Sequence, residues 1–91
     1  MNIEFDAYKV KLNDVKPALD GLAASLNLDG LKNELERLNF MQEAPGFWDD
    51  PEKSQKVVMK IKQAETKIER YHQMESSWED MMTICEMAAE E

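Results

Sequence analysis

Apolar residues recur through the first 26 residues at alternating steps of three and four. This spacing puts them on one face of a helix, so the pattern predicts an amphipathic helix over residues 3–26. Pro17 lies inside the pattern, and because the apolar positions stay in phase beyond it, we expect a kink and not a break. The apolar positions are Phe5, Tyr8, Leu12, Val15, Leu19, Leu22 and Leu26.

A turn is expected over Asn27 to Gly30, followed by a second helix over residues 30–43. Asp29 is the expected N-cap of this helix, and the run Ala44-Pro45-Gly46 ends it. Its predicted inner face consists of Leu31, Leu35, Leu38 and Met41.

The start of a third helix is strongly indicated by Asp50 as the cap, Pro51 at the first helical position and Glu52 in the first turn. No helix breaker follows until about residue 89, so we expect a helix over residues 51–89, roughly 58 Å long. Phe47 and Trp48 precede the cap, and we expect Trp48 to be a buried anchor between the second and third helices. The predicted apolar face is Val57, Ile61, Ala64, Ile68, Tyr71, Trp78, Met82 and Cys85.

Together these segments predict an all-α fold, an antiparallel three-helix bundle of coiled-coil-like character with a long third helix. We expect residues 1–91 to be a single helical domain, a fragment of a larger protein. The first two helices are shorter than the third, so we expect its far end to lack cover within the chain. An antiparallel homodimer through Trp78, Met82 and Cys85 would bury that end.

The net charge of −8 argues against a general nucleic-acid-binding protein and favours a partner with a basic surface. Charge is unevenly spread, because residues 71–91 carry six anions and no lysine or arginine. A basic stripe precedes them on the third helix. It would either contact RNA phosphates, pair with acids such as Glu34 and Glu36, or simply be solvated, and pairing or solvation is favoured. The stripe is Lys53, Lys56, Lys60, Gln63, Lys67 and Arg70.

Residues able to carry out chemistry are sparse. Cys85 is the single cysteine, which excludes an internal disulfide and favours the cytoplasm; it is expected to be buried and inert. Asp49, Asp50 and Glu52 lack the spacing of a calcium loop, and His72 has no zinc-ligand partner at a recognised spacing. No glycine-rich phosphate loop and no paired nucleophile and base are found, so we expect no enzyme activity, no metal and no cofactor.

The block Phe47 to Gln55, which reads Phe-Trp-Asp-Asp-Pro-Glu-Lys-Ser-Gln, resembles the N-terminal domain of bacterial peptide chain release factor 2. The Ser-Leu-Asn-Leu run from Ser25 to Leu28 and the leucine-rich second helix also agree, so the resemblance extends over nearly the whole chain. That family ends translation at UGA and UAA codons. Its Gly-Gly-Gln and Ser-Pro-Phe tripeptides are absent here, so no catalytic or codon-reading residue carries over.

What the resemblance implies is docking on the ribosome, at the stalk-base protein of the GTPase-associated centre and the nearby rRNA. Loops on rigid scaffolds often carry recognition, so we expect the contact at Asn27 to Gly30 or at Ala44 to Asp49. The alternative is a free-standing coiled-coil adaptor that dimerises through its long helix.

Overall fold

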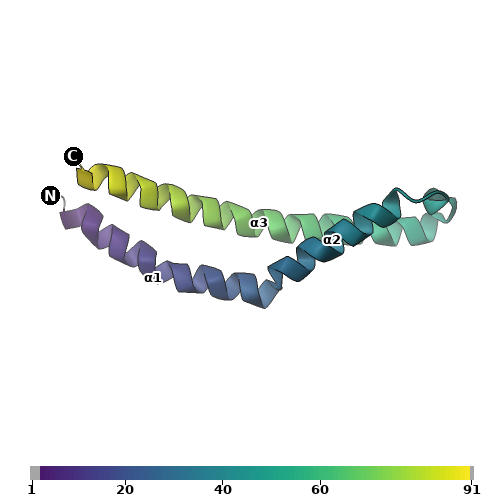
Figure 1. The fold of residues 1–91 in the computed structure, drawn as a ribbon, viewed down its shortest axis with the longest axis horizontal. Helices are drawn as coiled ribbons and strands as arrows, with labels where there is room; N and C mark the ends of the chain where they lie inside the picture. The colour runs from purple at the N-terminus through teal and green to yellow at the C-terminus, as the bar shows by residue number, and fades with distance from the viewer. Residues whose placement is uncertain (1–2, 91) are drawn as a thin grey trace. The chain divides into compact units, whose positions relative to one another are not determined.

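The computed structural model describes residues 3–90, which form three α-helices and one short 3-10 helix. In chain order these are α1 (Ile3–Leu26), α2 (Leu28–Gln42), η1 (Phe47–Asp49) and α3 (Pro51–Glu90). Figure 1 shows α3 as one continuous helix. The described residues contain no strand, and the predicted all-α fold with a long third helix is confirmed. No helix among residues 3–90 is both long enough and apolar enough to cross a membrane.

The helices are organised in two compact units. The first combines the residues up to Ser25 with those from Tyr71 onwards, and the second runs from Leu26 to Arg70. The first unit therefore pairs α1 with the C-terminal half of α3, and the second pairs α2 with the N-terminal half. Pro17 lies within α1, which continues through it as a single helix.

The core of the second unit comes from facing positions of α2 and α3. Leu38, Val57 and Ile61 are buried together, and Leu35, Met41 and Phe47 pack against them. All of these except Phe47 are positions at which the three-and-four spacing predicts an inner face, and that prediction is confirmed. Because α2 and α3 each present one apolar face, the unit closes as a helical hairpin.

The first unit is held by α1 packing on the end of α3. Leu19, Tyr71 and Cys85 are buried there. Two contacts show that α1 and α3 run antiparallel. Lys9 Nζ lies 3.9 Å from a carboxylate oxygen of Glu86. Lys16 follows Lys9 along α1 but lies over the ring of Trp78, which precedes Glu86 along α3.

This packing corrects the expectation that the far end of the third helix lacks cover. Trp78 and Met82 are half-buried and Cys85 is buried, all within one chain. The expectation assumed that the first two helices cover the same stretch of the third. In fact α1 and α2 pack on different halves of α3, so Trp78, Met82 and Cys85 are not an exposed dimer surface.

The junction between α1 and α2 is tighter than the sequence suggests. Asn27 alone leaves the helical conformation, with φ 51° and ψ 58°, and α2 begins at Leu28. Asparagine adopts this left-handed region more readily than most residues. The expected Asp29 cap is wrong, since Asp29 already lies in the first turn and the carbonyl of Asn27 accepts the N–H of Leu31 at 2.9 Å. The Asn27 carboxamide lies where a side chain at Gly30 would sit.

Candidate functional site: the turn between α2 and α3

The turn after α2 has a defined geometry. The N–H of Phe47 donates to the carbonyl of Ala44 at 3.2 Å, and Gly46 has φ 81° and ψ 1°. These angles belong to the third residue of a type II turn, a position that favours glycine, while proline suits the position before it. Pro45-Gly46 therefore sets a specific turn and not a flexible loop.

The start of α3 is fixed by hydrogen bonds to Asp50. Its side-chain Oδ1 accepts the N–H of Lys53 at 3.2 Å, so the predicted cap is confirmed. Its backbone is extended, as expected for the residue before a proline. The Ser54 hydroxyl, in a residue only 2% exposed, donates to the Asp50 carbonyl at 2.6 Å. Asp50 is thereby held through both its side chain and its main chain.

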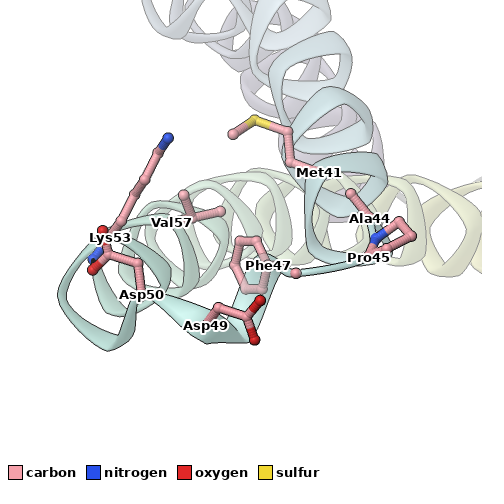
Figure 2. A pocket seen from close by; sticks show the side chains of 9 residues that line it. Met41, Ala44, Pro45, Phe47, Asp49, Asp50, Lys53 and Val57 are labelled. Carbon is pink, nitrogen blue, oxygen red and sulfur yellow. Dashed lines mark hydrogen bonds between the residues drawn. The ribbon is translucent and has the colours of Figure 1, made fainter.

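A hollow of about 420 Å³ opens at this turn. Figure 2 shows the Phe47 ring lying towards Val57, with Met41 on the α2 side and the Asp49 carboxylate on the opposite side of the ring. The lining of the hollow thus combines apolar and charged side chains. Its lining residues are Met41, Ala44, Pro45, Gly46, Phe47, Asp49, Asp50, Lys53 and Val57.

Trp48 does not have the role expected from the sequence. It is 62% exposed, and it is Phe47 that packs against the core of the second unit. The two rings meet edge to face with centroids 4.8 Å apart. Trp48 is therefore an exposed aromatic side chain on a firmly held turn. The prediction of a buried anchor is wrong because consecutive residues in a tight 3-10 turn point in different directions, and only one of the two can face inwards.

All six residues of the basic stripe are exposed. Within residues 3–90, none of its cations has an ion-pair partner inside 4 Å. Glu34 pairs instead with Arg37, with a shortest N–O distance of 2.6 Å. That hydrogen bond is the main cause that lowers the pKa of Glu34, and the charge of Lys60 contributes less. The stripe is a solvated face, as favoured from the sequence.

The remaining candidate groups all lie in the first unit. Cys85 is a buried thiol, as predicted. His72 is half-exposed, and its Nδ1 lies 3.5 Å from a Glu75 carboxylate oxygen. The Tyr71 hydroxyl donates to the other carboxylate oxygen of Glu75 at 3.4 Å. The pKa of Tyr71 is raised, first by burial and then by the Glu75 charge. Residues 3–90 bring together no group of three or more metal-ligating side chains.

Comparison with curated proteins finds similarity to peptide chain release factor 2 of several bacteria. The chain is 29% identical to the protein of Clostridium perfringens (strain SM101 / Type A) over 90 residues, which are 99% of this chain and 25% of that protein. It is 28% identical to the protein of Streptomyces avermitilis over 81 residues, which are 89% of this chain and 22% of that protein. It is 33% identical to the protein of Mycobacterium sp. (strain KMS) over 66 residues, which are 72% of this chain and 18% of that protein.

The chain thus spans about a quarter or less of the length of these relatives. No family model matches the chain. A search of solved structures also returns no significant match. The resemblance inferred from the block after the second helix is therefore confirmed as a distant similarity to one part of release factor 2.

Proposed function

Proceeding from this similarity, we propose that the chain is the ribosome-docking helical domain of a translation termination factor that acts at UGA and UAA codons. The alignment over 99% of the chain with a protein named peptide chain release factor 2 supports this reading. In this proposal both compact units belong to one functional domain, which works in the cytoplasm and itself catalyses nothing. Its partner is the stalk-base protein of the GTPase-associated centre, with the nearby rRNA.

The contact is proposed to lie at the turn between α2 and α3. The observation that carries this placement is the exposed Trp48 on a backbone fixed by the Pro45-Gly46 turn and the Asp50 cap. Tryptophan is enriched among the residues that dominate binding energy, and a rigid mount reduces the entropy lost on binding. The hollow at the same turn, with Phe47 and Val57 among its lining residues, offers a place for an apolar partner side chain.

The other proposed docking segment, at Asn27, has less to offer. One residue breaks the helix there, and Leu28 and Gly30 on its far side are half-buried. The basic stripe adds a second, weaker determinant, since cations without ion-pair partners attract the phosphates of nearby rRNA. We therefore place specificity at the turn and assign a salt-dependent contribution to the stripe.

The test is competition for ribosomes that present a UGA codon in the decoding site. The purified chain should displace labelled release factor 2 weakly, because it represents a small part of that protein. Trp48→Ala should reduce the competition about tenfold. Phe40→Ala is the matched control, because Phe40 is another exposed aromatic residue of the same unit. Equal losses from both substitutions would argue against a contact at the turn.

The stripe is tested separately by Lys60→Glu, with Lys62→Glu as its control. Both lysines are exposed on the same stretch of α3, but only Lys60 belongs to the stripe. We expect Lys60→Glu to weaken competition and to reduce its salt dependence, with a smaller effect at Lys62. If Lys60→Glu abolished binding while Trp48→Ala had no effect, the docking site would move from the turn to the stripe.

The adaptor alternative requires an unoccupied apolar seam along the long helix. Val57, Ile61 and Cys85 of that seam are already buried within the chain, so we do not adopt it.

A further inference from the structure

The turn between α2 and α3 concentrates negative charge. Residues 43–52 contain four acids and no lysine, arginine or histidine, and the first cation after them is Lys53. Figure 2 shows the Lys53 ammonium and the Asp49 carboxylate on opposite sides of the Phe47 ring and Val57. The side of the hollow at Asp49 is therefore negative. The four acids are Glu43, Asp49, Asp50 and Glu52.

The Asp49 carboxylate is held in place without an ion pair. Asp49 is the last residue of η1, and its N–H donates to the carbonyl of Gly46 at 3.1 Å. A Cβ added at Gly46 would lie 3.2 Å from Asp49 Oδ2, so the carboxylate lies directly beside the glycine. Within residues 3–90, no cation forms an ion pair with it inside 4 Å. Asp50, by contrast, already caps α3. Asp49 is thus the acid of this turn that is positioned to pair with a partner.

Aromatic and apolar surface adjoins this carboxylate. Trp48, the residue before Asp49, is exposed, and Phe47 lines the hollow together with Met41 and Val57. An arginine side chain matches this combination, because its guanidinium pairs with a carboxylate and stacks on an aromatic face, while its aliphatic stem packs on apolar surface. RNA does not match it, because the turn would bring backbone phosphates against four acids.

We infer that the turn contacts the protein of the stalk base and not its rRNA, through an arginine of that protein that pairs with Asp49 beside Trp48. This inference rests on the proposed function and names the chemistry of the partner at the same turn. An apolar side chain next to the arginine occupies the hollow. Phosphates are left to the basic stripe on α3, so protein and RNA are recognised by different parts of the second unit. The net charge of −8 also favours a basic protein surface.

The test is the dissociation constant of the full 91-residue chain for the stalk-base protein alone, without rRNA. Asp49→Asn should raise this constant about fivefold, the size of a partly desolvated charge pair, and should reduce its salt dependence. Glu43→Gln is the matched control. It removes the same charge from the same acidic segment, but Glu43 does not line the hollow, so the constant should change less than about twofold. Circular dichroism of each variant confirms that it remains helical.

The arginine is tested by chemical modification of the stalk-base protein. After its arginines are blocked with phenylglyoxal, the parent chain and Asp49→Asn should bind it equally, because the group that distinguishes them is gone. Acetylation of its lysines should leave the difference between the two chains intact. If acetylation removed the difference and phenylglyoxal did not, the assignment to arginine would be wrong.

Other outcomes separate this inference from the proposed function. If Asp49→Asn bound the protein like the parent chain while Trp48→Ala bound it weakly, the inference would be overturned and the docking function would stand. If the chain bound the isolated rRNA segment, more tightly as Asp49→Asn and more weakly as Trp48→Ala, the partner of the turn would be RNA. No binding to either component would overturn the docking function and this inference with it.

Discussion

The indole Nε1 of Trp78 donates a hydrogen bond to the backbone carbonyl of Leu12 at 2.6 Å, across 66 residues of sequence. A helical carbonyl oxygen has a second lone pair, so it can accept this bond without giving up its bond within α1. The Lys16 ammonium lies over the same ring. Trp78 therefore joins α1 to α3 within the first unit, and its structural role contrasts with the exposed position of Trp48.

The first prediction concerns this bond. Trp78→Phe retains an aromatic ring but removes the donor to Leu12, so it should lower the free energy of unfolding by about 1 kcal/mol, with a further loss from the smaller ring. Urea denaturation followed by circular dichroism measures this. Trp48→Phe is the matched control and should change the free energy by less than about 0.5 kcal/mol. A larger effect at Trp48 than at Trp78 would contradict the assignment.

The second prediction separates binding from stability at Trp48. Its ring makes an edge-to-face contact with the ring of Phe47. Trp48→Ala should cost at most about 1 kcal/mol of folding stability, the scale of a single aromatic pair. Phe47→Ala removes a side chain that packs on the core and should cost about 3 kcal/mol. Thermal melts of the two variants compare them, and similar melting temperatures would show that Trp48 is buried after all.

The third prediction concerns the start of α3. Ser54→Ala deletes the buried hydroxyl that donates to the Asp50 carbonyl, and should destabilise the chain by about 1 kcal/mol. Ser76→Ala, at an exposed position in the same helix, is the control and should have little effect. Asp50→Ala removes the cap and should cost about 0.5 to 2 kcal/mol. Protection of the first amides of α3 from hydrogen exchange should fall in Ser54→Ala and in Asp50→Ala, and it should not fall in Ser76→Ala.

The fourth prediction is a pH dependence. The pKa of Tyr71 is raised in the folded chain, first by burial and then by the Glu75 charge. Above the ordinary tyrosine pKa of about 10, the unfolded chain therefore loses this proton more readily than the folded chain does, so stability falls as the pH rises. Tyr71→Phe should make the alkaline loss of stability shallower. Tyr8→Phe, at an exposed position, is the control, and an unchanged slope in Tyr71→Phe would contradict the prediction.

Much of the fold follows from local patterns. The apolar spacing correctly gives the faces of α2 and α3, because a helix shows its buried side through its sequence period. Asp50 and Pro51 mark the start of α3 through the chemistry of their own side chains, which needs no tertiary information. The burial of Cys85 follows from its place in the same spacing.

What the patterns did not give depends on contacts between distant segments. A three-and-four spacing shows that α3 has an apolar face but not which helix covers which half, so the cover of Trp78 by α1 was missed. The same spacing places Tyr8 and Val15 on the predicted buried face of α1, although both are exposed in the structure. The exposure of Trp48 depends on the direction in which a 3-10 turn points successive side chains, and the spacing carries no information about that.

The central claim is that an exposed tryptophan on a rigid turn docks this domain on the ribosomal stalk base. The most direct measurement is the dissociation constant of the chain for the isolated stalk-base protein with its rRNA segment, compared between Trp48→Ala and Phe40→Ala at one salt concentration. The account predicts that Trp48→Ala weakens binding about tenfold, or about 1.4 kcal/mol, while Phe40→Ala leaves it unchanged. Binding that is unaffected by Trp48→Ala, or no binding by the parent chain, would contradict it.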